Sequence, residues 1–579
     1  MIFKPEFSSS DIPLYEYPRP QFKRDSYFSL NGKWQYAICD YGKFNGEYEG
    51  EILVPYSPES TLSGVNKQLR KTQGLHYRRV FTLPDGFNEG KVFLNVGACD
   101  QICSVFLNGK RVGSHEGGYL SFSFDITDLL TDGENELTFT VVDDADSANY
   151  GRGKQVYKRG GIWYTAISGI WQSVWLESTP DKYLSSLKIL PDFDKTEVYV
   201  TPYSPFDEQV TVEILGDDGE VIFTQSGRTN TPITLPANGC KPWTPDSPEL
   251  YPIVVKMGED EVRSYFGLRT FSTKKIDGIL YPTINGEPIF HNGLLDQGYF
   301  HDGIYTPSAN KVMYDEVKAV KDMGFNMLRK HIKIEPMLWY YYCDILGVLV
   351  WQDMINGGEK YKALRIMLAP FFNLRLNDKN YESMGRPLSS REQYMREAEG
   401  EIEQLFNCVA LCVWTPFNEA WGQFDSIGVW QKLKQIDGSR LYDHASGWQD
   451  NGGGDFCSKH IYFRKAKPKN DGVRVLALSE FGGYSLSIEG HTFTDKKFGY
   501  KRFSSPQKLM VAYEKLYNDE VIPAIQSQGL SATVYTQLTD VEDEVNGLFT
   551  YDRVIKVDAQ KIKDINEKVY KAFNEKTRS

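Results

Sequence analysis

The sequence predicts a multidomain protein in which two β-sandwich domains precede a C-terminal (β/α)8 TIM barrel. At 579 residues the chain is too long for a single ordinary core. Short strand-like segments separated by turns fill roughly the first 270 residues, and strand and helix patterns alternate after them. We therefore predict a jelly-roll domain over 1–180, an immunoglobulin-like β-sandwich over 181–273 and the barrel over 274–579.

The first domain is predicted from short alternating strands and from the turns between them. Helix signals are few in this part of the chain, and Asn108-Gly109 is typical of a tight hairpin turn. Short strands at regular spacing indicate a β-sandwich or jelly roll. The clearest strand patterns lie at 76–83, 92–96, 105–107 and 137–142.

A second and smaller β pattern follows. Segments 198–201, 210–214 and 253–256 are β-prone, and Asp218-Gly219 marks a turn. About ninety residues of this kind suit an immunoglobulin-like sandwich. The sequence lacks the Cys-Trp-Cys framework of antibody domains, so no disulfide of that type is expected.

The alternation after residue 271 favours a closed barrel over a doubly wound sheet. Helical patterns at 308–323 and 337–346 flank strand-like segments such as 348–353. No Gly-x-Gly-x-x-Gly turn marks a dinucleotide site. Eight strands can be assigned, and segment 355–388 after the third is predicted to be a long loop that shapes the mouth of the site.

Two of the predicted strands end in a glutamate. Glu419 follows the apolar run 408–412 on the fourth strand, and Glu480 follows the run 473–477 on the seventh. A carboxylate at the end of a buried strand is costly unless it is neutralised, hydrogen-bonded or useful. In a barrel both would lie at the C-terminal face, where barrel enzymes keep their chemistry. The alternative is that both glutamates are structural, capping helices or holding arginine partners.

Composition excludes some functions and leaves others open. The net charge is −12 and the pI is about 5.4, which argues against a nucleic-acid partner. No apolar run reaches the ~18 residues that span a membrane, and the N-terminus has no signal-peptide pattern. The eight cysteines lie mostly singly in apolar runs, as expected of free thiols. We expect a cytoplasmic protein, or one released without a signal peptide. Aromatic residues, at 14%, suit either sugar stacking or sandwich cores.

Short motifs recur along nearly the whole chain, and their order is more informative than any one of them. They are Leu30-Asn31-Gly32-Lys33-Trp34, Ser168-Gly169-Ile170-Trp171, Trp243-Thr244-Pro245 with Pro248-Glu249-Leu250-Tyr251, Phe266-Gly267-Leu268-Arg269, Asn285-Gly286-Glu287-Pro288, Asn418-Glu419 and Ser479-Glu480-Phe481-Gly482.

With these motifs in this order, the chain resembles the retaining β-glycosidases of glycoside hydrolase family 2, which include β-galactosidases, β-glucuronidases and β-mannosidases. The resemblance implies a galactose-binding-like jelly roll, an immunoglobulin-like domain and a catalytic barrel. It implies that Glu419 is the general acid/base and Glu480 the nucleophile, with carboxyl groups about 5 Å apart. Asn418 would then bond the sugar 2-hydroxyl.

The resemblance also implies residues that orient the nucleophile or the sugar. Arg329 would keep Glu480 ionised and His331 would face the sugar, although both could merely pair with barrel carboxylates. Tyr462 matches the tyrosine that hydrogen-bonds the nucleophile. Tyr535 stands where relatives carry a stacking tryptophan, and it could equally pack the barrel. The further candidates for substrate contact are Asp296, Trp351, Asp353 and Gln537.

Departures from the family pattern bear on the sugar. The glucuronidases carry Asn-x-Lys after the eighth strand, and Asn546-Gly547-Leu548 lacks that lysine, so a glucuronide is not expected. Trp163 stands where relatives carry an acidic residue. Trp351 and Asp353 look more like the mannosidase branch. The magnesium ligands of some galactosidases have no clear match, so no metal and no cofactor are expected.

The leading hypothesis is an exo-acting retaining β-glycosidase, β-galactosidase-like, that removes a terminal sugar. The alternatives are a β-mannosidase or another terminal-sugar specificity and, in a different class, a non-catalytic carbohydrate-binding protein. The expected partner is a carbohydrate substrate, without nucleic acid or membrane. Many members of the family are oligomers, so a homo-oligomer fits the resemblance.

Overall fold

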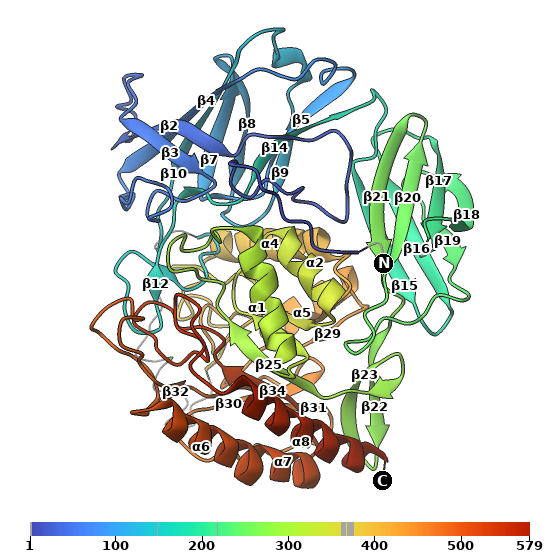
Figure 1. The fold of residues 1–579 in the computed structure, drawn as a ribbon, viewed down its shortest axis with the longest axis vertical. Coiled ribbons are helices and arrows are strands. Elements are labelled where there is room, and N and C mark those ends of the chain that lie inside the picture. The colour runs from blue at the N-terminus through green and yellow to red at the C-terminus, as the bar shows by residue number, and fades with distance from the viewer. Residues whose placement is uncertain (1–2, 147–148, 217, 360–365, 367–375, 579) are drawn as a thin grey trace.

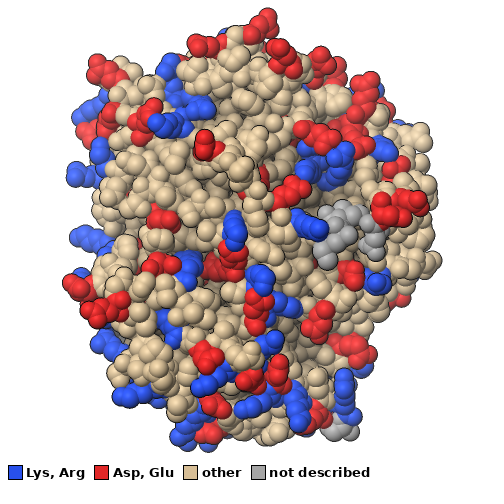
Figure 2. Space-filling model, in the orientation of Figure 1, with Lys and Arg blue, Asp and Glu red and all other residues tan. Residues whose placement is uncertain are grey.

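The computed structural model describes residues 3–146, 149–216, 218–359, 366 and 376–578. Its strands and helices form two β-rich domains and a barrel, as Figure 1 shows, with the first domain in blue and the second mostly in green. The predicted fold class is confirmed. On the face shown in Figure 2, acidic and basic side chains are interspersed.

The first domain consists of two packed antiparallel sheets. Along Asn135–Val142 every second residue is buried, so one face of the strand lies against the core between the sheets and the other faces outward. Leu137, Phe139 and Val141 are the core residues of this strand. One sheet has the order β1 (Phe28–Ser29), β14 (Val174–Thr179), β5 (Lys91–Val96), β9 (Phe122–Asp125); the other has the order β3 (Gly50–Val54), β2 (Gly32–Asp40), β4 (Gln73–Phe81), β10 (Asn135–Val142), β7 (Ile102–Leu107), β8 (Lys110–Glu116).

The second domain is a smaller sandwich with the same period of two. Val210, Val212 and Ile214 alternate with partly exposed residues on one strand and line the core. All eight cysteines of the chain are free, as predicted, and all but Cys39 are buried. The sheets have the orders β15 (Ser186–Asp192), β16 (Glu197–Tyr203), β19 (Ile233–Pro236) and β18 (Val221–Arg228), β17 (Gln209–Leu215), β20 (Tyr251–Met257), β21 (Asp260–Phe266).

The barrel is a sheet of eight parallel strands whose residues are buried almost throughout. Side chains of the interior cover one face and helices cover the other, which explains the continuous apolar runs in the sequence. Glu419 follows the fourth strand and Glu480 lies in the seventh. In chain order the strands are β25 (His291–Asp296), β26 (Met327–Lys330), β27 (Leu349–Asp353), β28 (Leu411–Thr415), β29 (Leu441–Tyr442), β30 (Phe456–Ile461), β31 (Val475–Gly482) and β34 (Leu530–Thr536).

The helices of the barrel pack through one apolar face. In the last helix the buried residues Ile562, Ile565, Val569 and Phe573 recur at three- and four-residue spacing. No helix among the described residues is long and apolar enough to cross a membrane. The helices are α1 (Asn310–Asp322), α2 (Met337–Leu346), α4 (Leu388–Leu405), α5 (Ser426–Ile436), α6 (Pro506–Leu516), α7 (Ile522–Gln528) and α8 (Ala559–Arg578), with the single-turn segments η1 (Thr127–Leu129) and η2 (Tyr517–Val521).

Several short strands lie outside the main sheets of the two sandwich domains and the barrel. A three-stranded sheet that follows the second domain leads into the first barrel strand. Part of the long loop predicted over 355–388, at 360–365 and 367–375, lies outside the described residues. These short strands are β22 (Phe271–Ile276), β23 (Ile279–Ile284), β24 (Glu287–Pro288), β6 (Cys99–Asp100) with β13 (Gly169–Ile170), β11 (Gln155–Val156) with β12 (Tyr164–Thr165), and β32 (Tyr484–Ser485) with β33 (Lys501–Arg502).

One loop of the first domain, residues 149–168, crosses onto the barrel. The backbone N–H groups of Arg152 and Gly153 donate to the carbonyl of Asn356 at 3.0 and 2.9 Å. Gly153 has φ +60°, and a Cβ there would lie 2.7 Å from the carbonyl oxygen of Ile332, so glycine is required. This close approach places Lys154, the next residue, at the C-terminal face of the barrel.

Candidate active site

The two glutamates predicted from the strand ends lie together at the C-terminal face of the barrel. Both are buried, with exposed fractions of 8% for Glu419 and 5% for Glu480. Glu419 and Ala420 adopt left-handed backbone conformations, with φ of 51° and 63°, in the loop that follows the end of β28 at Thr415. The N–H of Glu419 donates to the carbonyl of Ser446 at 2.9 Å, which fixes this sharp turn.

The separation of the glutamates bears on chemistry. One carboxylate oxygen of each and a ring nitrogen of His460 all lie within 4.8 Å of one another. This separation is close to the ~5 Å implied by the family resemblance, and it is shorter than the ~6.5–9.5 Å of a site that places water between two carboxyl groups. Within the described residues no other group of metal-ligating side chains is as compact. The hydrogen bond between His460 and Glu419 accounts for the compact arrangement of these three side chains without a metal ion.

Glu480 is surrounded by groups that favour its ionised form. Burial by itself raises the pKa of this carboxyl group, but neighbouring positive charges outweigh burial and lower the pKa to about 2. The charges of His460 and Arg329 contribute most, and Lys154 adds to them. Tyr462 donates a hydrogen bond to Oε2, and Arg329 Nη1 lies 3.4 Å from Oε1.

Glu419 has a different partner. Its Oε1 lies 2.6 Å from Nδ1 of His460. The other ring nitrogen of His460 lies 2.9 Å from Oγ of Ser446, which donates to Oγ of Ser479 at 2.9 Å. His460 was not among the sequence candidates. The available signal was its place at the end of the sixth strand, two residues before Tyr462.

Arg329 joins three of the predicted site residues. It donates to both carboxylate oxygens of Asp353 at 2.9 and 3.0 Å and to Oδ1 of Asn418 at 2.8 Å. It also donates to the backbone carbonyl of Ser479 at 2.9 Å, one residue before Glu480. A rigid guanidinium with all these partners holds the ends of several strands in one geometry.

His331 is neutral, and one of its ring nitrogens has no hydrogen-bond partner among the described residues. Burial lowers the pKa of His331 to about 4. Nδ1 lies 2.6 Å from Oδ2 of Asp353 and therefore carries the ring proton, donated to that carboxylate. Nε2 is buried and has no hydrogen-bond partner among the described residues. An acceptor left unpaired in this place is suited to a substrate hydroxyl.

Four other predicted site residues form hydrogen bonds, an ion pair or ring contacts with neighbouring protein side chains. Their partners account for their polar atoms or rings, so the structure does not bring them to the glutamates as free contacts. Asp296 accepts from Lys330 Nζ at 2.6 Å, Trp351 Nε1 donates to His291 at 2.9 Å, Tyr535 packs edge-on against Tyr513 and Phe481, and Gln537 bonds Gln297 and Asn546, both at 2.9 Å.

A small cavity lies beside Glu419. Asn418, Lys154, Trp163 and Trp421 line it, and its volume is about 20 Å³. Trp163 meets Trp421 edge to face, with ring centroids 5.2 Å apart. This volume holds about one water molecule. Lys154 and Trp163 come from the first domain, so the site is built from two domains.

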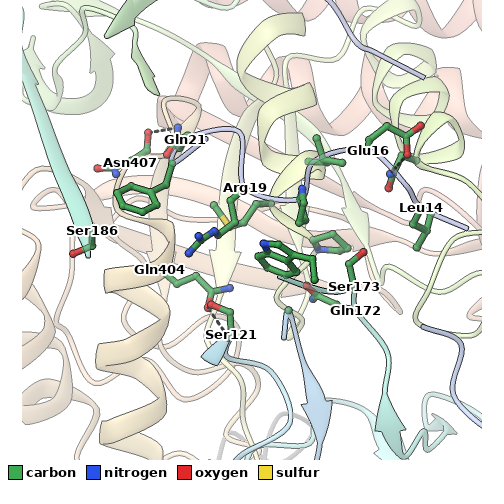
Figure 3. Close-up of a pocket in the computed structure, with 18 of the residues that line it drawn as sticks. Leu14, Glu16, Arg19, Gln21, Ser121, Gln172, Ser173, Ser186, Gln404 and Asn407 are labelled. Atoms are coloured by element: carbon green, nitrogen blue, oxygen red, sulfur yellow. Dashed lines mark hydrogen bonds between the residues drawn. The ribbon is translucent and has the colours of Figure 1, made fainter. Parts of the chain in front are cut away.

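A second cavity of about 230 Å³ lies where the N-terminal segment, the first domain and the barrel meet (Figure 3). Gln21 Nε2 donates to the carbonyl of Asn407 at 2.6 Å, and Ser121 donates to Oε1 of Gln404 at 2.9 Å. Its lining residues are distinct from those around the glutamates. We therefore regard it as a domain junction.

Replacing Arg329 with methionine is expected to lower the free energy of unfolding by about 3–5 kcal/mol, because the substitution leaves buried carboxylates without their cation. Burial raises the pKa of Asp353, but Arg329 and His331 outweigh burial and hold it below its usual value. The ion pair therefore stabilises the fold above the unfolded pKa of about 3.9, and the effect is lost as pH falls through the folded value. Urea unfolding at about pH 7 and about pH 3 measures both.

The matched control for this variant is Arg70→Met, at an exposed arginine of the first domain. It is expected to change the unfolding midpoint little, since surface charges contribute little to stability. Equal destabilisation of the Arg329 variant at the two pH values would contradict an ionic origin.

Comparison with known proteins agrees with this architecture. Residues 58–160 match the family model described as "Glycosyl hydrolase 2 galactose-binding domain-like". The β-galactosidase of Streptococcus thermophilus is 24% identical over 573 residues, covering 95% of this chain and 50% of that protein. The β-galactosidase of Halalkalibacterium halodurans is 22% identical over 390 residues, covering 63% of this chain and 35% of that protein. The chain thus spans half or less of the length of these two relatives.

Solved structures share the fold over nearly the whole chain. The β-D-glucuronidase of Dictyoglomus thermophilum has a TM-score of 0.73 at 16% identity, covering 95% of this chain and 98% of that one. A GH2 β-galacturonidase of Eisenbergiella tayi has a TM-score of 0.68 at 18% identity, with coverages of 95% and 98%. The chain is thus similar to a galactose-binding-like domain of glycosyl hydrolase family 2 over residues 58–160, to β-galactosidases in sequence and to solved glycosidases in fold.

Proposed function

We propose that this protein is an exo-acting retaining β-glycosidase that removes a terminal sugar by double displacement. The observation that carries the proposal is the pair Glu419 and Glu480, whose carboxylate oxygens lie within 4.8 Å in different surroundings. Cations hold Glu480 ionised, as a nucleophile requires. Glu419 lies beside the cavity and has a hydrogen-bonding partner of its own, as suits a proton donor.

The reaction would proceed in two balanced steps. In the first, an oxygen of Glu480 bonds the anomeric carbon while the bond to the aglycone breaks, and Glu419 gives its proton to the departing oxygen. In the second, water attacks the same carbon, Glu419 takes its proton and Glu480 is released. Asn418, oriented by Arg329, and the unpaired Nε2 of His331 would bond sugar hydroxyls.

For the identity of the terminal sugar, two candidate classes are proposed. The resemblance leads with a β-galactoside, and the missing lysine after the eighth strand argued against a glucuronide. Lys154 is a specific observation in favour of a second candidate, an acidic sugar. It lines the cavity beside Glu419, although it comes from a different element than the lysine of the glucuronidases. Its ammonium group could meet a sugar carboxylate.

A panel of nitrophenyl glycosides tests the proposal. The panel should contain β-galactoside, β-mannoside, β-glucoside, β-glucuronide and β-galacturonide, with the first product followed by proton NMR. We expect turnover of at least one β-glycoside, with the β-anomer of the free sugar appearing first because two inversions restore the configuration. Initial release of the α-anomer would contradict the mechanism, and binding without turnover throughout the panel would favour a carbohydrate-binding protein.

Lys154→Met separates the two sugar classes within the same panel. If the substrate is acidic, the variant should lose kcat/KM on the uronides while any activity on neutral glycosides changes much less. An equal loss on all glycosides would instead indicate that Lys154 acts through its effect on Glu480.

A further inference from the structure

His460 lies between the two glutamates in a way that no sequence motif indicated. Its side chain is fully buried at the end of β30. Nδ1 lies 2.6 Å from Oε1 of Glu419 and 3.7 Å from Oε2 of Glu480. A single ring nitrogen is therefore within ion-pair range of both carboxyl groups.

The hydrogen bonds around the ring bear on where its protons lie. The hydroxyl of Ser446 has one hydrogen and donates it to Ser479, so its oxygen must accept from Nε2–H of His460. At 2.6 Å, Nδ1 and the carboxyl oxygen of Glu419 share a hydrogen. A hydrogen held on Nδ1 as well as on Nε2 makes the ring a positively charged imidazolium, with the acidic proton of Glu419 on its other oxygen.

We propose that His460 is a positioning residue that acts as a counter-ion shared by the two glutamates in turn. The inference rests on the proposed glycosidase function and deepens it. In the free enzyme Glu419 is protonated and the imidazolium balances ionised Glu480. In the glycosyl-enzyme Glu480 is an uncharged ester, Glu419 is a carboxylate, and the same imidazolium balances Glu419.

Charge and protons balance through both steps of this scheme. Glycosylation moves one proton from Glu419 to the aglycone oxygen and removes one negative charge from Glu480. Deglycosylation returns a proton from water to Glu419 and restores the charge on Glu480. His460 keeps both of its ring protons, and the three groups together stay neutral. The negative charge moves across less than 5 Å past a cation that does not move.

Other charged groups also face this cluster and set the background against which His460 acts. They are Arg329 on β26, Asp353 on β27, Asp443 after β29, Lys154 from the first domain and Glu544 after β34. Arg329 is already bound to both oxygens of Asp353, and Lys154 is shared with Glu544. For Glu419, the described ion pair is the one with His460.

The ring's protonation can be measured without activity. Nitrogen-15 NMR of the histidine rings at neutral pH should show one imidazolium that is absent from His460→Asn. The chain has eight histidines, so the ring signal that disappears in His460→Asn identifies His460 directly. A neutral His460 ring in the wild-type protein would overturn the proposal even if the protein proves to be an active glycosidase.

Kinetics tests the charge itself. His460→Ala should lower kcat/KM by about 10²-fold, a share of the acid–base contribution. Added imidazole, which can be protonated, should restore a large part of the rate, whereas pyrazole, of similar shape but neutral, should not. Equal rescue by both rings, or by neither, would assign His460 a merely structural role.

The pH profile gives an independent readout. In His460→Asn, which keeps a neutral donor, loss of the cation raises the pKa of Glu480, so the acidic limb of kcat/KM should move up by about 1 pH unit or more. A lower rate with an unmoved limb would contradict the proposal. His301→Asn, at a half-exposed histidine outside the site, is the matched control. Failure of the glycosidase proposal would show separately, as absence of turnover by the wild-type protein.

Discussion

Replacing Glu480 with glycine is expected to reduce kcat by a factor on the order of 10⁵ to 10⁶, the scale seen when a covalent nucleophile is removed. The variant leaves a space beside the anomeric carbon next to Arg329 and Tyr462. Azide should fill that space, restore turnover of an activated glycoside and give a glycosyl azide of inverted configuration. The rate and the product's configuration are measured together by spectrophotometry and NMR.

Glu480→Gln is the matched control for this experiment. The glutamine fills the same volume, so the variant should be equally inactive and should not respond to azide. Thermal unfolding of both variants shows whether the fold survives. A folded Glu480→Gly protein that azide cannot rescue, or that retains most of its activity, would remove Glu480 from the role of nucleophile.

Replacing Glu419 with alanine is expected to cost about 10²- to 10⁴-fold in kcat/KM on glycosides with poor leaving groups, since general acid catalysis is lost. A dinitrophenyl glycoside needs little protonation to depart, so its kcat/KM should stay near the wild-type value. Azide should then attack the accumulated glycosyl-enzyme and give a product of retained configuration. A series of aryl glycosides of graded leaving-group acidity measures the difference.

The opposite configurations of the two azide products assign the two roles independently. Glu392→Ala, at an exposed glutamate on α4, is the control for a loss of charge outside the site. If Glu419→Ala reduced kcat/KM equally on all leaving groups, Glu419 would be a structural carboxylate, the alternative that the sequence left open.

The two roles follow from surroundings that the fold makes unequal. Glu480 lies in β31, between β30 and β34 in the barrel, where Arg329 of β26 and Tyr462, which follows β30, reach it. Glu419 lies beyond the end of its strand, in a left-handed turn that faces the cavity. Identical side chains thereby differ in charge partners and in access to the aglycone.

Local patterns were sufficient for much of this protein. The period of two in strands such as 137–142 and the spacing of Ile562, Ile565, Val569 and Phe573 follow from which face each element buries, and sequence shows such periods directly. The ends of buried parallel strands meet at one face of a barrel, so Glu419 and Glu480 could be paired before any coordinates were known.

Tertiary structure alone decided which polar residues are available to a substrate. Asp296 looked like a free acceptor, but Lys330 neutralises it, and Tyr535 packs against Tyr513. A residue's partners come from segments far away along the chain, and a single sequence carries no record of them. For the same reason Lys154, brought by a loop of the first domain, could not be foreseen.

The sequence by itself thus determined the domain types, the barrel and the two strand-end glutamates, because these depend on local periodicity and on strand direction. Only the tertiary structure decided which side chains surround each glutamate, above all His460, because electrostatic partnership depends on distances of a few ångströms between residues on different strands.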